Sequence, residues 1–326
     1  MDTNNVLEIR DLHVIYETDQ STVYAVNGVN LTVTKGKTLG LVGETGAGKT
    51  TTALSIMRLL PKRIGIIRQG SITLDGHNVM ELTESDMRLI RGDTVSMIFQ
   101  DPMTSLNPVI TVGKQIRESL ELHRNGRSDK EIDARVDEML EMVGIPASRK
   151  NDYPHQFSGG MKQRVVIAIA LACSPELLIA DEPTTALDVT IQAQVLELMR
   201  KIKAELNTST ILITHDLGVV AEMCDKVAIM YCGMIMEYGT LRDVYKNPAH
   251  PYTQGLFDSL PDLDTEVPRL KPIPGMVLDP TELPAGCPFE NRCARATERC
   301  KTECPKLRTL SGTHTVRCHN VEGGEQ

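Results

Sequence analysis

The chain has 326 residues, of which 41% are hydrophobic and 24% are charged, as is ordinary for a globular protein with room for more than one domain. Its formal net charge of -8 excludes the dominant basic surface of a general nucleic-acid-binding protein. No apolar run approaches the roughly 20 residues that cross a bilayer, and the N-terminus MDTNNVLEIRDLHV lacks the pattern of an export signal. We therefore expect a cytoplasmic chain.

The N-terminal part predicts strands followed by a strand–turn–helix unit. Apolar and polar residues alternate between residues 6 and 34, which is typical of half-buried antiparallel strands. The apolar run TLGLVG at 38–43 predicts a buried strand that enters a tight turn. A helix is expected from Lys49 to Leu60, where Pro61 stops it, and another strand at 94–99.

The middle of the chain predicts a helical insert, about 101–175, between the strands at 94–99 and 177–181. Its clearest helix covers 129–143, with Ser128 and Glu131 as a capping box and Gly144 at its end. The later elements expected are a helix near 189–206, a strand at 210–214 and a hairpin around Cys232 and Gly233.

The composition changes near residue 247. Ten of the 17 prolines lie at or beyond Pro248, so regular helices and central strands are not expected there. The sequence thus predicts a first domain at 1–247 and a second domain at 248–326.

The segment GETGAGKT at 43–50 fits the phosphate-binding pattern G-x-x-x-x-G-K-[ST]. Its glycines let backbone N–H groups turn toward phosphate oxygens, Lys49 can neutralise the β- and γ-phosphates, and Thr50 can bind Mg²⁺. The alternative is an accidental glycine-rich turn, which the strand–loop–helix context disfavours. The candidate nucleotide-binding residues here are Gly43, Glu44, Thr45, Gly46, Ala47, Gly48, Lys49, Thr50 and Thr51.

Polar residues follow three further apolar strands. Asp181 in LLIADEP suits the Mg²⁺ shell, and Glu182 is placed to polarise an attacking water. His215 could contact a γ-phosphate or that water, although a histidine at a strand end is more often structural. Gln100, which follows the apolar residues MIF, is equally weak evidence for a functional role when taken by itself.

The segment FSGGMKQR at 157–164 precedes a strongly apolar helix. Ser158, Gly159 and Gly160 would lie at the helix N-terminus, where free N–H groups form a second anion site. A plain serine N-cap is the alternative.

The tail GCPFENRCARATERCKTECPKLRTLSGTHTVRC holds five of the eight cysteines. In a cytoplasmic chain we expect them to be reduced. Thiolates suit Zn²⁺ or an iron–sulfur cluster, but the C-x₂-C pair of zinc ribbons is missing, and free thiols are a third alternative. Cys173, Cys224 and Cys232 are expected to be buried small hydrophobes.

Taken together, these segments resemble the nucleotide-binding subunit of an ABC transporter over about residues 5–245. The motifs in order are the loop 43–50, Gln100, the signature at 158–162, Asp181 and Glu182, ALD at 186–188, and His215. The resemblance implies an α/β P-loop NTPase fold of the ABC ATPase type, with an antiparallel β subdomain, a helical subdomain and a small cysteine-rich C-terminal domain. ATP and Mg²⁺ are the implied cofactors. In this family two domains face each other head to tail, so that each signature contacts the partner's ATP.

The resemblance also implies roles for single residues. The adenine-stacking aromatic maps onto Tyr16, with Tyr24 as an alternative. Gln100 would contact Mg²⁺ and water, Glu182 would be the catalytic base and His215 the switch residue. Asp188 would contact the partner domain. One departure is Met161 in FSGGM, where LSGGQ is commoner, because a thioether cannot make the hydrogen bonds of an amide.

The stretches FQDPMTSLNP, FSGGMKQRV, TTALDVTIQAQVLELM and NPAHPYTQGL look like the D-type ATPase of oligopeptide and dipeptide importers. Importers of nickel, glutathione or some sugars share this architecture. The resemblance implies a heterodimer with a second, homologous ATPase, two permease subunits and an extracytoplasmic peptide-binding protein. The chain would then lie on the cytoplasmic side of the membrane, bound through the permeases only and without nucleic acid.

Tails of this family resemble the one here and can hold a [4Fe–4S] cluster. The implied ligands are Cys287, Cys293, Cys300 and Cys318, with Cys304 as an extra thiol that could replace Cys300. Zinc remains the alternative metal. Two rival functions are a soluble ABC ATPase acting on nucleic acid or ribosomes, and a metal- or redox-regulated binding module.

Overall fold

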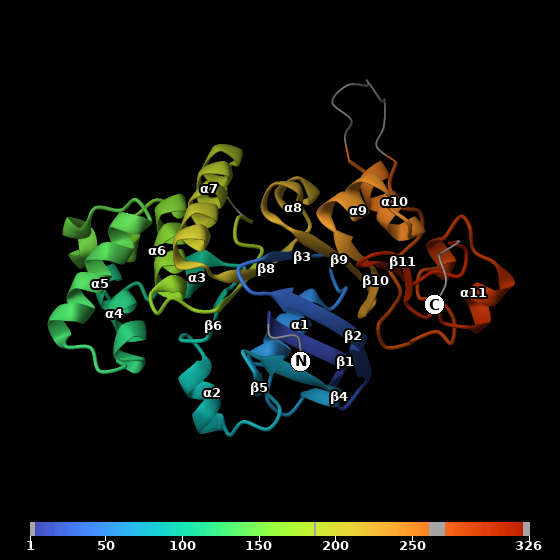
Figure 1. Cartoon of the computed structure of the whole chain (residues 1–326), viewed down its shortest axis with the longest axis horizontal. Helices are drawn as coiled ribbons and strands as arrows, with labels where there is room; N and C mark the ends of the chain where they lie inside the picture. Colours follow the sequence, from blue (N-terminus) through green and yellow to red (C-terminus); the bar gives the residue numbers. More distant parts are fainter. Residues whose placement is uncertain (1–3, 186, 261–270, 322–326) are drawn as a thin grey trace. The chain divides into compact units, whose positions relative to one another are not determined.

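The structure is a computed structural model that describes residues 4–185, 187–260 and 271–321. The chain divides into two compact units. The first contains the residues up to Glu8, Thr32–Thr38 and Ile72–Met223. The second contains Ile9–Leu31, Leu39–Ser71 and the described residues from Cys224 onward. Figure 1 gives the element labels used below.

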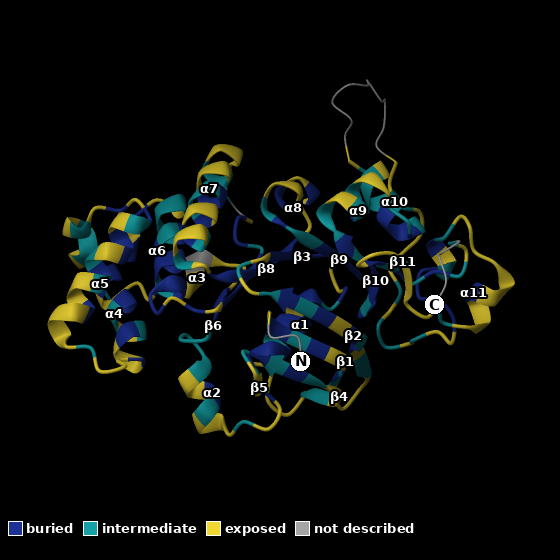
Figure 2. Cartoon of the chain, viewed as in Figure 1, coloured by how far each residue is buried: buried dark blue, intermediate teal, exposed yellow. Residues whose placement is uncertain are grey.

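Three adjacent parallel strands form the centre of the first unit: β6 (Val95–Ile98), β7 (Leu177–Asp181) and β8 (Ser209–Thr214). Every residue in them is buried (Figure 2), which explains why they appear in the sequence as continuous apolar runs. Because parallel strands end at the same edge of a sheet, the residues that follow β6, β7 and β8 gather there.

The helices of the first unit include a layer formed by α4, α5 and α6, which pack on one another (Figure 1). Helix α6 also packs against β6 and α7. The bounds are α2 Glu84–Ile90, α3 Pro102–Ser105, α4 Val112–Leu122, α5 Asp129–Met142, η1 Ala147–Asn151, η2 Pro154–Gln156, α6 Gly159–Leu171, α7 Val189–Leu206 and α8 Leu217–Met223.

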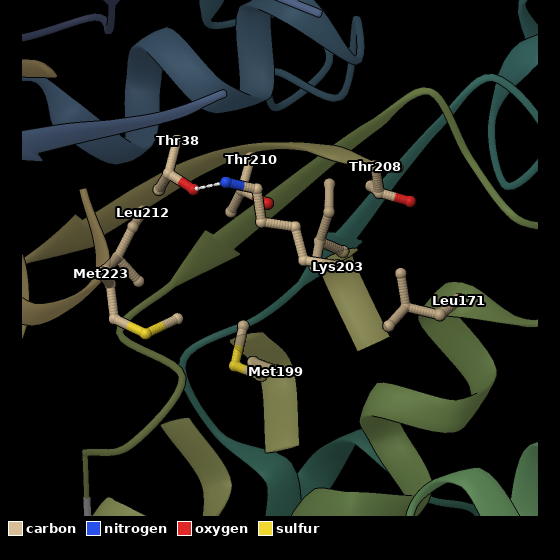
Figure 3. Close-up of a pocket in the computed structure, with 9 residues that line it drawn as sticks. Thr38, Leu171, Met199, Lys203, Thr208, Thr210, Leu212 and Met223 are labelled. Atoms are coloured by element: carbon tan, nitrogen blue, oxygen red, sulfur yellow. Dashed lines mark hydrogen bonds between the residues drawn. The ribbon is translucent and has the colours of Figure 1, made fainter. Parts of the chain in front are cut away.

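A small cavity of about 10 Å³ lies between α7 and β8 in the first unit (Figure 3). Its lining is mostly aliphatic, and the Lys203 ammonium crosses it to donate to Thr38 Oγ1 at 2.6 Å. The volume is that of about one water molecule, so the cavity is a packing feature and not a ligand site.

The second unit contains five strands of a mixed sheet in the order β11-β12-β10-β9-β3. Strand β3 pairs with β9 in parallel, while β9–β10, β10–β12 and β11–β12 are antiparallel. Cys232 and Gly233 both have positive φ (45° and 76°) and form the predicted turn of the β9–β10 hairpin. The bounds are β3 Thr38–Val42, β9 Lys226–Tyr231, β10 Met234–Thr240, β11 Arg308–Ser311 and β12 His314–Val316.

A four-stranded sheet has the order β2-β1-β4-β5. Its alternating strands are β1 (Asn5–Glu17), β2 (Thr22–Thr34), β4 (Gly65–Leu74) and β5 (His77–Asn78), and β4 and β5 are antiparallel. The remaining helices, all in the second unit, are α1 Lys49–Ile56, α9 Leu241–Lys246, α10 Pro251–Asp258, η3 Glu290–Arg292 and α11 Glu298–Thr302.

Two local predictions were wrong. Helix α1 ends at Ile56 and not at Leu60, because Arg58 turns to a positive φ of 50° before Pro61 is reached. A regular helix also forms in the proline-rich part. In α10, Pro251 takes the first helical position, where no N–H is needed, and His250 Nδ1 accepts from the Tyr252 N–H at 2.9 Å.

Among the described residues, no helix has both the length and the apolar character needed to cross a membrane.

Candidate nucleotide site

The phosphate-binding loop lies between β3 and α1 in the second unit, as predicted. Gly48 precedes the helix with φ of 97°, and a Cβ there would come within 2.3 Å of the Ala25 carbonyl oxygen. A Cβ on Gly43 would approach the Met230 oxygen to 2.1 Å. Both positions therefore require glycine, whose missing side chain lets the loop backbone pack closely on its neighbours.

The two polar side chains at the start of α1 differ in exposure. Lys49 is buried, and its ammonium donates to the carbonyl oxygens of Gly43 at 2.7 Å and Glu44 at 3.0 Å. Thr50 is exposed. The Lys49 side chain thus reaches across the loop. A phosphate group bound there would contact the Lys49 ammonium and the N–H groups at the start of α1.

Tyr16 lies beside this helix, since its hydroxyl and that of Thr51 are 3.1 Å apart. The alternative, Tyr24, is 39% exposed and donates its N–H to Pro280 O at 2.9 Å. The hydrogen bond to Thr51 supports Tyr16 as the aromatic residue near the loop.

Two contacts to the loop were not predicted. The Glu44 N–H donates to the Tyr252 hydroxyl at 3.0 Å, and the Glu44 carboxylate pairs with Arg292. In the sequence nothing connects residues more than 200 positions apart, so only the folded second unit reveals these contacts.

In the first unit, the predicted catalytic residues converge on Glu182. Its carboxylate accepts from Gln100 Nε2 at 3.1 Å and lies 3.0 Å from His215 Nδ1. The Thr185 hydroxyl, which sequence reasoning missed, donates to the same carboxylate at 2.8 Å. Thr185 stands only three positions after Glu182, so its spacing was the available signal. The three groups fix the direction in which the carboxylate points.

The backbone conformation of Glu182 also helps to orient its side chain. Glu182 directly follows β7 and adopts a positive φ of 47°, with its N–H bonded to Ile213 O of β8 at 2.8 Å. Such a conformation is uncommon for a non-glycine residue and turns the side chain out of the strand direction. Asp181, the last residue of β7, stays 4% exposed.

The signature segment begins α6 as predicted. Ser158 is the N-cap, and its hydroxyl accepts from the Met161 N–H at 3.4 Å. Ser158 and Gly159 are exposed, so the start of this helix faces the surface of the unit. Asp188 likewise caps α7 by accepting from Ile191 N at 3.0 Å, while Ala186 of the ALD segment lies outside the described residues.

Arg149 contacts both Met161 of the signature and Phe157, which precedes it. Its guanidinium lies 4.3 Å from the centre of the Phe157 ring, and Nη1 is 3.8 Å from the Met161 sulfur. It also pairs with Asp152 at 2.7 Å. The Met161 sulfur therefore has a polar partner in Arg149, although it lacks the amide of a glutamine. Nothing in the sequence indicated this contact.

The structure thus shows two sets of predicted residues, one within each unit. The second unit holds the phosphate-binding loop and Tyr16, and the first holds the Glu182 cluster and the signature.

The tail cysteines are largely desolvated. Cys287, Cys300 and Cys318 are buried, and Cys293 and Cys304 are partly exposed. Burial, with a smaller contribution from the thiols of Cys300, Cys304 and Cys318, raises the pKa of Cys287 to about 12. Within the ranges that the structure describes, no three or more His, Cys, Asp or Glu side chains form a group that could hold a metal ion.

The other three cysteines are buried, as predicted. Burial raises the pKa of Cys173 and of Cys232 to about 11, so both thiols stay protonated at neutral pH.

Two family models match the chain. The model "ABC transporter" matches residues 26–185, and "Oligopeptide/dipeptide transporter, C-terminal region" matches residues 236–300. The first covers the phosphate-binding loop, the signature and Glu182, and the second covers the β10–α10 region and three of the tail cysteines. Together they define the chain as an ATPase of the ABC class.

Similarity to characterised sequences extends over almost the whole chain. The oligopeptide transport ATP-binding protein AppD of Bacillus subtilis is 50% identical over 99% of both chains. OppD of Salmonella typhimurium is 51% identical, covering 97% of this chain and 93% of its own. The chain therefore belongs to the family of ABC transporter ATP-binding proteins that carry the oligopeptide/dipeptide transporter C-terminal region.

Solved structures agree on the fold. A dimeric ATP-binding cassette, MJ0796, in a post-hydrolysis state with ADP and Pi has a TM-score of 0.64 and 27% identity, covering 72% of this chain and 99% of its own. The cbiO1 protein of Clostridium perfringens gives the same TM-score and 27% identity over 75% and 92%. The predicted ABC ATPase fold is thus confirmed.

Proposed function

We propose that this chain is the ATP-hydrolysing subunit of an ABC importer that powers the uptake of oligopeptides or dipeptides. The observation that carries the proposal is the near-full-length similarity to peptide transport ATP-binding proteins, which includes the C-terminal region as well as the cassette. The orientation of Glu182 by three hydrogen-bonding groups supports hydrolysis rather than binding alone.

In this proposal the loop 43–50 holds the phosphates of ATP through its N–H groups and Lys49, and Tyr16 stacks on the adenine. Thr50, Asp181 and Gln100 would hold Mg²⁺, which would neutralise charge on the phosphates, since oxygen ligands are those that this ion prefers. Glu182 accepts a proton from the attacking water, while Gln100, Thr185 and His215 keep its carboxylate oriented. His215 would act as the switch residue of this site.

The partners are part of the proposal. Ser158, Gly159 and Gly160 would contact the γ-phosphate of ATP held by a second, homologous ATPase, and Asp188 would contact that partner. Two permeases and an extracytoplasmic binding protein would complete the importer, with this chain on the cytoplasmic side of the membrane.

The division of the chain into a nucleotide-binding domain at 1–247 and a C-terminal domain at 248–326 is also part of the proposal.

The first test separates ATP binding from hydrolysis. We expect Lys49→Ala to weaken ATP binding at least about tenfold, because it removes the charge next to the phosphates. Glu182→Gln should bind ATP normally and hydrolyse it about 100-fold more slowly or worse, since the amide cannot act as a base. Binding and turnover are measured in the assembled transporter, with the exposed Glu222→Gln as a control. Near-normal turnover by Glu182→Gln would contradict the catalytic assignment.

The second test concerns the transported molecule. Uptake of a labelled dipeptide, a longer peptide and Ni²⁺ is compared in cells with and without the chain. We expect peptide uptake to be lost and Ni²⁺ uptake to remain. Loss of Ni²⁺ uptake alone would favour the alternative of a nickel importer, and unchanged uptake of all three would point to another solute, such as glutathione.

We include a structural [4Fe–4S] cluster in the tail in this proposal, with Cys287, Cys293, Cys300 and Cys318 as ligands. Burial raises the pKa of Cys293, and the thiols of Cys318 and Cys300 add to this shift, which supports their being near Cys293. The Cys304 sulfur lies 3.9 Å from the Met234 sulfur, and its thiol also adds to the raised pKa of Cys287. A bound metal would displace the protons of Cys287, Cys293 and Cys318, whose pKa values burial raises.

Metal analysis of the anaerobically purified chain tests this part. About four irons and four sulfides per chain are expected, lost in Cys318→Ser and retained in the control Cys304→Ser. Stoichiometric zinc without iron would make the tail a zinc domain. If the chain contains neither iron nor zinc, the tail cysteines are free thiols, and the metal part of the proposal is wrong.

A further inference from the structure

Glu44, inside the phosphate-binding loop, is held by two side chains that come from the far end of the sequence. Arg292 makes two hydrogen bonds to its carboxylate, from Nη1 to Oε2 at 2.6 Å and from Nη2 to Oε1 at 3.1 Å. Tyr252, on α10, accepts the Glu44 backbone N–H at 3.0 Å. One loop residue is thus fixed through its side chain and its backbone.

Both side chains are themselves rigidly held. The Arg292 side chain is 3% exposed, and its Nε donates to Pro274 O at 3.1 Å. Tyr252 is fully buried, with its ring centre 4.8 Å from that of Tyr231 and 5.3 Å from that of Phe289. Because aromatic packing and buried charge-assisted bonds allow little movement, they transmit a fixed geometry to Glu44.

The pairing also has an electrostatic consequence. A bare carboxylate in a loop that receives a triphosphate would repel it, and that repulsion would be strong in a partly buried place. Glu44 is 28% exposed, and the bidentate guanidinium neutralises it. The N–H groups and Lys49 can then act on the phosphates without an opposing charge.

We propose that Arg292 and Tyr252 are positioning residues for nucleotide binding, acting through Glu44 to pre-shape the phosphate-binding loop and cancel its negative charge. This inference rests on the proposed role of the loop in holding ATP. It makes the C-terminal region part of the nucleotide site. Arg292 ends the short turn η3, which Cys293 follows and whose first N–H, that of Glu290, donates to Cys287 O at 3.0 Å, so the fold of the cysteine-rich region determines where the guanidinium lies.

The test is a titration of the full-length chain with a fluorescent ATP analogue. Arg292→Gln should raise the Kd about tenfold, because it leaves Glu44 uncompensated and the loop less ordered. Tyr252→Phe removes only a hydroxyl and should raise the Kd roughly threefold. The matched control is Arg295→Gln, three positions away on the same segment, where the guanidinium contacts Gln254; its Kd should not change.

A double-mutant cycle separates positioning from a general structural role. If Arg292 acts through Glu44, Arg292→Gln should change the Kd by less than about twofold once Glu44 is already Gln. Equal effects in both backgrounds would overturn the proposal, as would an unchanged Kd for Arg292→Gln. Should Arg292→Gln fail to fold, as judged by circular dichroism, the single variant Tyr252→Phe decides, because its hydroxyl accepts the Glu44 backbone N–H and not the side chain. An unchanged Kd for Tyr252→Phe would then overturn the proposal.

Lys49→Ala distinguishes a failure of this inference from a failure of the proposed nucleotide site. Loss of binding in Lys49→Ala together with normal binding in Arg292→Gln and Tyr252→Phe would reject this inference and leave the nucleotide site intact. Normal binding in Lys49→Ala would instead reject the nucleotide site, and the inference with it.

Discussion

Single residues in this chain acquire their chemical character from neighbours that the sequence keeps far apart. Glu182 illustrates this, because Gln100 precedes it by 82 positions and His215 follows it by 33. Each arrives at the same sheet edge because β6, β7 and β8 are parallel and adjacent. A carboxylate held from several sides keeps the orientation that proton abstraction needs.

His250 provides a prediction for pH. It is 1% exposed, and burial lowers its pKa from 6.5 to about 3. The folded state therefore favours the neutral ring, and the resulting stability is fully present above pH 6.5. It is lost as the pH falls from 6.5 toward 3, by about 1.4 kcal/mol per pH unit, because the unfolded chain takes up the proton first.

Urea unfolding at pH 7.5 and 5.5, followed by circular dichroism, measures this loss. His250→Gln should be less stable at pH 7.5, since its packing changes, but the pH-dependent loss should be smaller by about 1.4 kcal/mol. An equal pH-dependent loss in both proteins would show that His250 does not titrate on unfolding.

Elements were predictable where local signals and tertiary packing agreed. The bounds of β7 and α7 match the prediction, since a five-residue apolar run suits a central strand and Asp188 caps an 18-residue amphipathic helix. Helix α5 has the predicted capping box: the Ser128 hydroxyl accepts from the Glu131 N–H, and the Glu131 carboxylate accepts from the Ser128 N–H at 2.7 Å. Helix α1 differs because its end depends on Arg58 and not on Pro61.

The α5 cap gives a prediction for one element. Ser128→Ala should destabilise the first unit by about 1 kcal/mol, because the Glu131 N–H at the helix start loses its acceptor. Thermal unfolding measures the effect. Lys130→Ala, an exposed change in the same turn, should leave stability within about 0.5 kcal/mol. Equal behaviour of the two variants would show that the cap does not contribute.

At the scale of the whole molecule, one buried carboxylate joins distant parts of the C-terminal region. Glu237 on β10 is fully buried and lies 2.8 Å from His314 Nε2 on β12. It also accepts the N–H groups of Ala249 and His250, at 2.8 and 2.9 Å, just before α10. This single side chain on β10 therefore holds both β12 and the start of α10 in place.

We expect Glu237→Ala to destabilise the second unit by about 3 kcal/mol or more, because it leaves His314 and two N–H groups buried without their acceptor. Limited trypsin digestion should then cut within 271–321 much faster than in the native chain. Glu303→Ala, which breaks the exposed pair with Arg299, is the control and should have little effect. Unchanged digestion of Glu237→Ala would contradict this role.

The sequence by itself determined the class of fold and most of the candidate nucleotide site. Apolar runs, caps and the loop 43–50 are local patterns, whose meaning depends on residues within a few positions of each other. Only the tertiary structure decided which distant groups meet: Gln100 and His215 on Glu182, and Arg292 and Tyr252 on Glu44. The physical reason is that such contacts arise from chain folding over tens to hundreds of residues, and no periodicity or spacing in one sequence encodes them.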